Sequence, residues 1–152
     1  MMGTLRAMSP PSMRSLVAID PDTALFGWAR FLDGRLYTCD VAITPYLPDF
    51  PPGTEYVCEM PEDRPGSRHR KNDILRLALA AGRIVGSREC KFRVPSEWKG
   101  QLPKAVHWER MREVMTPEEL QILFEALEKT SKGAHPEISD AVALGLTELG
   151  RL

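Results

Sequence analysis

The stretch that decides the fold is Leu16-Val17-Ala18-Ile19-Asp20-Pro21-Asp22. Its first four residues are apolar, and such a run is typical of a strand that is buried on both faces in the middle of a sheet. Asp20 follows directly, so its carboxylate is expected where a central strand ends. An ionised group in that place is unfavourable unless a metal ion, a phosphate-binding role or a helix cap compensates it. Asp20 is therefore a candidate functional residue.

More strands are expected downstream. Residues 26–32 and 35–43 are rich in β-formers and flank Asp33-Gly34, a dipeptide typical of a tight hairpin. The proline-rich residues 44–53 predict an irregular loop. Residues 54–61 then repeat the opening pattern, a short apolar strand that ends in an acid, Glu59, and a proline. If this strand lies parallel to the first, Glu59 and Asp20 lie near each other, because parallel strands end at the same edge of a sheet.

The second half of the chain predicts one further strand and several helices. The strand is expected at residues 89–95 and the helices at 73–85, 103–115, 117–129 and 137–149. Asn72 is expected to cap the first helix, and Thr116 with Glu119 a capping box at the third. Glu137 and Asp140 share one face of the last helix because they are three residues apart. The sequence thus predicts an α/β fold with five strands.

Composition limits the class of protein. The chain has 152 residues, which suits one domain, expected at residues 16–152 after a loose leader at 1–15. The formal net charge of −1 gives no overall attraction for nucleic acid, so such a partner needs local basic patches. No apolar run is long enough for a membrane span. The three cysteines form no CxxC pair, which favours reduced thiols in a cytosolic protein over zinc ligands.

A basic loop is expected between the second acid and the first helix. The loop runs from residue 62 to 71, and its cationic side chains are Arg64, Arg68, His69, Arg70 and Lys71. Such a loop is ordinarily only solvated, but it is also suited to contact phosphates.

The acids suggest a chemistry when they are taken together. Two-metal phosphoryl chemistry requires several carboxylates around two divalent ions about 3.5–4 Å apart, and Mg²⁺ prefers such oxygen ligands. Each acid also has an ordinary interpretation. Asp20 could be a turn or cap residue, and Glu137 and Asp140 could only complement the dipole of their helix. His135 is a further candidate ligand, although a cap or loop role is more usual for such a histidine.

Several motifs carry a resemblance to a known family. They are Val17-Ala18-Ile19-Asp20-Pro21-Asp22, Phe26-Gly27-Trp28-Ala29, Val57-Cys58-Glu59, Leu77-Ala78-Leu79-Ala80-Ala81-Gly82, Pro95-Ser96-Glu97-Trp98-Lys99-Gly100 with Pro103-Lys104, and Ser139-Asp140-Ala141-Val142-Ala143-Leu144-Gly145-Leu146. With these motifs the chain resembles the RuvC-type Holliday junction resolvases of the RNase H-like superfamily, in particular the compact versions carried by phages. The resemblance covers residues 16–149.

The resemblance implies a mixed sheet, three strands antiparallel and then parallel strands, flanked by helices on both faces. It also implies a homodimer that pairs through helix 73–85, and paired nicking of branched DNA with two Mg²⁺ ions, for which Mn²⁺ substitutes. A phage-encoded version acts in the host cytoplasm.

The resemblance also assigns residues. Asp20, Glu59 and Asp140 match the metal carboxylates, and Glu137 matches a fourth ligand that is an acid or a histidine in relatives, so His135 stays an alternative to it. Lys99 and Lys104 fall where the family keeps lysines that contact DNA phosphate. One departure is Asp22, which stands where the family usually has glycine.

Other functions remain open from the sequence. A different RNase H-like nuclease would act on RNA or an RNA–DNA hybrid, and a non-catalytic relative would only bind branched DNA. The run Ile19-Asp20-Pro21-Asp22-Thr23 is also similar to the phosphate loop of actin-like ATP-binding domains, but a second phosphate loop and a Gly-rich adenosine motif are missing.

Overall fold

The sheet has the predicted mixed architecture. The computed structural model describes residues 13–63, 71–99 and 102–152. The strands are β1 (Ser15–Asp20), β2 (Leu25–Leu32), β3 (Arg35–Ile43), β4 (Glu55–Glu59) and β5 (Lys91–Arg93), in the spatial order β3-β2-β1-β4-β5. Neighbours are antiparallel from β3 to β1 and parallel from β1 to β5. An α/β fold with a five-stranded mixed sheet is therefore confirmed.

The strand register places the first two acids at one edge. β1 and β4 are parallel neighbours with Ile19 opposite Cys58, so the next residues, Asp20 and Glu59, both end their strands there. The hairpin between β2 and β3 also follows the prediction. Asp33 and Gly34 have φ values of 48° and 80°, and positive φ at both central residues is what a type I′ turn requires.

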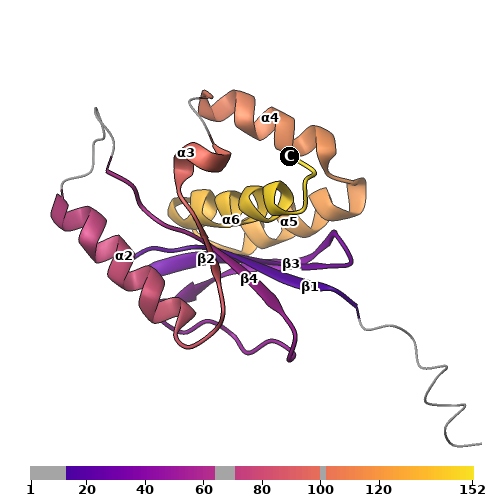
Figure 1. The fold of residues 1–152 in the computed structure, drawn as a ribbon. Helices are drawn as coiled ribbons and strands as arrows, with labels where there is room; N and C mark the ends of the chain where they lie inside the picture. Colours follow the sequence, from indigo (N-terminus) through magenta and orange to yellow (C-terminus); the bar gives the residue numbers. More distant parts are fainter. Residues whose placement is uncertain (1–12, 64–70, 100–101) are drawn as a thin grey trace, which may run out of the picture.

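Helices cover both faces of the sheet (Figure 1). They are α2 (Lys71–Val85), α3 (Pro95–Trp98), α4 (Lys104–Val114), α5 (Pro117–Lys129), the 3₁₀ turn η1 (Lys132–Ala134) and α6 (His135–Glu148). α2 lies on one face, and α4, α5 and α6 lie on the other. None of the described helices is long and apolar enough to cross a bilayer.

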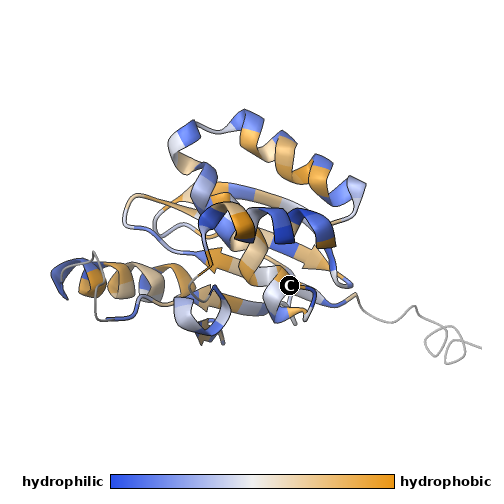
Figure 2. Cartoon of the chain, turned by 90° about the horizontal axis from the view of Figure 1, so that it is seen from above, coloured by the Kyte–Doolittle hydropathy of each residue, from blue (hydrophilic) through white to orange (hydrophobic). Residues whose placement is uncertain are grey.

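The unbroken apolar run of β1 is explained by these two layers. Leu16 and Ala18 belong to the core on the α6 face, whereas Val17 and Ile19 belong to the core on the α2 face. Side chains alternate along a strand, so a strand covered on both sides needs apolar residues at every position. In Figure 2 the strands are largely orange, and the helices alternate between blue and orange.

Some predicted boundaries were wrong. Asn72 lies inside α2 and does not cap it, because the helix already begins at Lys71. The strand predicted at 89–95 is limited to Lys91–Arg93, the residues that pair with β4. α6 begins two residues early, because Pro136 is compatible with a first helical turn. α5 spans the predicted residues, with both hydrogen bonds of its capping box formed.

Two glycines let α6 lie close against the sheet. Gly27 on β2 pairs with Asp20, and a Cβ atom at Gly27 would overlap the backbone carbonyl of Glu137. A Cβ atom at Gly145 would overlap the ring of Phe31. The absence of a side chain at Gly27 therefore allows the start of α6 to approach the end of β1, and its absence at Gly145 allows the later part of α6 to pack on Phe31.

A buried ion pair joins α5 to the end of the chain. Arg151 donates to both carboxylate oxygens of Glu119, at 2.6 and 2.8 Å, and to the carbonyls of Gly34 and Val114. The backbone N–H of Leu36 also donates to Glu119, at 2.7 Å. Although burial opposes its ionisation, these donors lower the pKa of Glu119 to about 2.

Replacement of Arg151 tests how much this ion pair contributes to the free energy of unfolding. Arg151→Ala leaves the buried Glu119 carboxylate with the backbone donors of Leu36 and Thr116, and with the exposed Arg35, at 3.9 Å, as the remaining cation near it among the described residues. We expect the free energy of unfolding, measured with urea, to fall by about 3 kcal/mol. The control is Arg14→Ala, which removes an exposed pair with Glu55 and should cost less than about 1 kcal/mol. Equal losses in both variants would contradict this assignment.

Candidate functional site

Four acids converge where β1 and β4 end. Asp20 and Glu59 come from the strand ends, and Glu137 and Asp140 come from the first two turns of α6. The other three acids lie close enough to Asp20 to affect its ionisation. Burial is the largest cause that raises the pKa of Asp20, and the negative charges of Glu59, Asp140 and Glu137 raise it further. The structure therefore brings together all four acids that the sequence singled out.

Lys99 lies among these acids. Its ammonium nitrogen is 3.2 Å from Oε2 of Glu59 and 3.3 Å from Oδ2 of Asp140. Burial alone would lower the pKa of Lys99, but the charges of Glu59, Asp140 and Asp20 outweigh it and raise that pKa. A fixed positive charge thus bridges the strand edge and α6. It compensates part of the repulsion within the cluster.

The position of Lys99 depends on the short helix α3. The backbone N–H and the hydroxyl of Ser96 donate to the two carboxylate oxygens of Glu62, at 2.7 and 2.8 Å. Glu62 follows β4, so this contact ties the start of α3 to the segment behind Glu59. Lys99 then ends α3, with its N–H bonded to the carbonyl of Pro95.

Glu137 lies against Asp22. Burial raises the pKa of Glu137, and the charge of Asp22 and a hydrogen bond with it raise that pKa further. Oε2 of Glu137 is buried, and no donor among the described residues reaches it. A buried acceptor oxygen of this kind is unfavourable until a cation or a donor meets it. Asp22, the departure from the family pattern, therefore adds a fifth carboxylate at the edge of the site.

The chemical type of the candidate ligand atoms suits a hard divalent cation. Every candidate ligand is a carboxylate oxygen, which suits Mg²⁺ or Mn²⁺. Across the described ranges, however, no three His, Cys, Asp or Glu side chains are gathered closely enough to hold an ion as they stand. The ammonium of Lys99 lies between two of the acids, Glu59 and Asp140.

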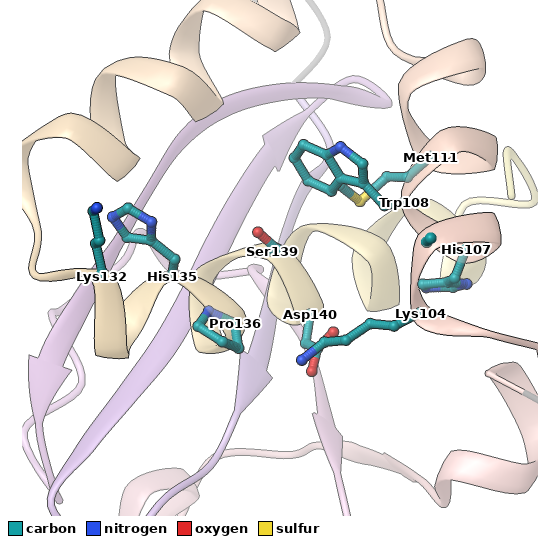
Figure 3. A pocket seen from close by; sticks show the side chains of 10 residues that line it. Lys104, His107, Trp108, Met111, Lys132, His135, Pro136, Ser139 and Asp140 are labelled. Carbon is teal, nitrogen blue, oxygen red and sulfur yellow. The ribbon is translucent and has the colours of Figure 1, made fainter.

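His135 has a structural partner. Its Nε2 donates to the carbonyl of Leu127, at 2.6 Å, and approaches that of Thr130, at 3.2 Å. The ring therefore satisfies carbonyls at the end of α5. Figure 3 shows it at the start of α6, separated along the helix from Asp140. These contacts favour Glu137 over His135 as the fourth acidic-site residue.

The predicted basic residues are distributed unequally. Lys99 is inside the site, and Lys104, the exposed first residue of α4, extends toward Asp140 (Figure 3). Lys71 is exposed at the start of α2. The predicted phosphate contacts Arg64, Arg68 and Arg70 lie outside the described residues.

Two aromatic residues at the site were not predicted as functional. The Trp98 ring lies 4.7 Å from the ammonium of Lys99 and packs edge-on against His107 on α4. Burial lowers the pKa of His107, and the charge of Asp140 opposes that effect. The three-residue spacing between Lys104 and His107 put both on one helical face. Nothing in the sequence placed that face beside Asp140.

Comparison with known proteins adds no assignment. No protein-family model matches the chain, and no curated protein sequence matches it. The functional conclusion therefore depends on the residues and their geometry.

Neutralising Asp20 should stabilise the metal-free protein. Because the folded-state pKa of Asp20 is raised above its ordinary 3.8, ionisation disfavours the folded state as the pH rises above that value. In EDTA at pH 7 we expect Asp20→Asn to increase the free energy of unfolding by about 1 kcal/mol, with no gain near pH 3. Asp40→Asn, at an exposed residue of β3, is the matched control. A less stable Asp20→Asn at pH 7 would contradict the electrostatic account.

Proposed function

We propose that this protein is a metal-dependent endonuclease of the RNase H-like superfamily that resolves Holliday junctions or related branched DNA by paired nicks. The observation that carries the proposal is the convergence of Asp20, Glu59, Glu137 and Asp140, from three separate elements, at one edge of the sheet. The strand order and the resemblance of the motifs support the same class.

The four acids would hold the divalent ions. Bound Mg²⁺ would supply an activated water and stabilise the oxygen that leaves the cleaved phosphodiester. The chain's own contribution is to hold the carboxylates in a partly buried, well-defined place, since Asp20 and Glu59 end paired strands and Gly27 leaves room for Glu137. The buried oxygen of Glu137 that lacks a donor gains a partner when an ion is bound.

The two lysines would hold the DNA. Lys99 has a flexible stem and an ammonium that already lies between two acids, so it can turn from them to a phosphate oxygen. Lys104 stands at the mouth of the site on its own helix. Phosphate contacts of this kind position the nucleic acid and carry no base information. We propose that Lys71 and the arginines that precede it in sequence, Arg64, Arg68 and Arg70, also contact phosphates.

The helix α2 would form the dimer. Its inner face buries Ala80, Ala81 and Ile84, whereas Leu75 and Leu79 are 67% and 66% exposed. Exposed leucines one helical turn apart are typical of a surface that a partner covers. A second copy paired there would provide two active sites for two nicks.

Cleavage of a synthetic four-way junction tests the proposal. With Mg²⁺ or Mn²⁺ we expect symmetric nicks near the branch point, mapped on denaturing gels. Asp20→Asn should abolish cleavage and keep junction binding, because it removes a ligand charge and leaves the fold intact. Asp40→Asn should cut like the wild type.

Other outcomes separate the alternatives. Full Mg²⁺-dependent cleavage by Asp20→Asn would contradict the proposed site. Cleavage of RNA or of an RNA–DNA hybrid, with junctions left intact, would favour a different RNase H-like nuclease. Junction binding without turnover at any metal concentration would indicate a non-catalytic relative.

A metal ion and the ammonium of Lys99 should compete for the carboxylates of Glu59 and Asp140. Lys99→Met removes an ammonium that bridges two acids, so we expect calorimetric Mn²⁺ affinity to increase about tenfold, which corresponds to about 1.4 kcal/mol. Cleavage should nevertheless decrease, because the phosphate contact is lost. The control Lys91→Met removes an exposed partner of Glu148 and should leave Mn²⁺ affinity unchanged. Unchanged affinity in Lys99→Met would show that this lysine does not compete with the ion.

A further inference from the structure

A groove of about 490 Å³ lies beside the acid cluster, between α4 and α6. Its wall includes Trp108 and Met111 from α4, and Pro136 and Ser139 from α6, and it shares Asp140 with the cluster. The volume is in the range of pockets that bind small organic ligands, about 300–1,000 Å³. The proposed metal and phosphate contacts use Asp140 and Lys104 from its lining, but the apolar part of the groove has no role in them.

The shape and lining of the groove suit a flat heteroaromatic ring. The groove is lined by Trp108 from α4 and by Pro136 and Ser139 from α6, and Figure 3 shows the side chains of all three. Indole and proline surfaces can enclose the two faces of a ring, and the hydroxyl can donate to or accept from its edge. Nucleic-acid-binding proteins hold unstacked bases in this way.

The charges around the groove indicate that the ring belongs to a nucleic acid strand. Lys104 lies at one end of the groove and Lys132 at the other, and both are exposed (Figure 3). Cations at both ends match a base that carries a phosphate on each side of its sugar. Asp140, the acid that borders the groove, is also part of the site where the phosphodiester would be cut.

We propose that this groove, the α4/α6 base pocket, binds one nucleobase that has left the helical stack, next to the phosphate that the acids attack. The inference rests on the proposed nuclease function and adds a specificity site to it. Binding there removes one base from its neighbours, a change that costs least at a branch point, where stacking is already interrupted. The pocket thereby favours branched over continuous duplex DNA.

Photo-cross-linking tests the occupant directly. Four-way junctions that carry 5-iodouracil at single positions around the branch point are bound to the Asp20→Asn protein and irradiated, and cross-linked peptides are sequenced by mass spectrometry. We expect one position to cross-link to Trp108. An abasic nucleotide at that position should weaken binding about tenfold, the scale of a lost base–aromatic stack.

Two variants control for unfolding and for general DNA affinity. Trp108 packs against the core, so its removal would also disturb the fold, whereas Ala105 is exposed and borders the pocket. Ala105→Phe should fill the pocket, reduce the Trp108 cross-link at least fivefold and make the abasic substitution neutral. Tyr46→Ala, at an aromatic that is 74% exposed and outside the pocket, should change none of these results.

The outcomes separate the pocket from the nuclease activity. Cross-links that fall outside α4 and α6, in junctions that the wild type cuts, would overturn the base pocket and leave the proposed function standing. A Trp108 cross-link that Ala105→Phe abolishes, in a protein that cuts no substrate with any metal, would support the pocket and overturn the nuclease. An abasic substitution that weakens wild type and Ala105→Phe equally would overturn the pocket.

Discussion

The contact between the first turn of α6 and the sheet is the constraint on which the site depends. Glu137 reaches the end of β1 because Gly27, the partner of Asp20 on β2, leaves room for the helix backbone. A longer side chain at residue 27 would move α6 outward and take Glu137 and Asp140 with it. The apolar core beneath, with Ile138 and Leu144 buried on β1 and β2, holds the helix in that place. Packing therefore sets the distances between charges.

The repulsion between these charges is offset in part by one cation, Lys99. Asp20, Glu59 and Asp140 repel one another in a buried place, and Lys99 offsets part of that repulsion through its contacts with two of them. Sites built in this way sacrifice stability for function, because the groups that bind a ligand are uncompensated without it. The same lysine would be released to the substrate when a metal replaces it. One side chain thus serves the free and the loaded states of the proposed enzyme.

Local patterns predicted the strand edge, the hairpin and α5 because each depends on residues that are close in sequence. Asp20 and Glu59 follow parallel strands, Asp33-Gly34 adopts the turn that its φ preferences allow, and Thr116 with Glu119 closes a capping box.

The sequence could not show that Lys99 bridges two acids 40 and 41 residues away from it, or that α4 and α6 enclose a groove. Those contacts depend on where α3 and α4 lie relative to the sheet, and no pattern among residues close in sequence determines that position. Asn72 was wrong as a cap because α2 already includes it, and the preference of Asn for helix starts does not by itself fix where a helix begins.

The ion pair between Glu119 and Arg151 affects the order in which parts of the chain fold during synthesis. Its five groups come from the β2–β3 turn, the start of β3, the end of α4, the first turn of α5 and residue 151. During synthesis from the N-terminus, Arg151 leaves the ribosome after every other partner. Until then the Glu119 carboxylate has its backbone donors and no buried counter-charge. The nascent sheet can pair earlier, but the ion pair that joins α4 and α5 forms only after residue 151 has left the ribosome.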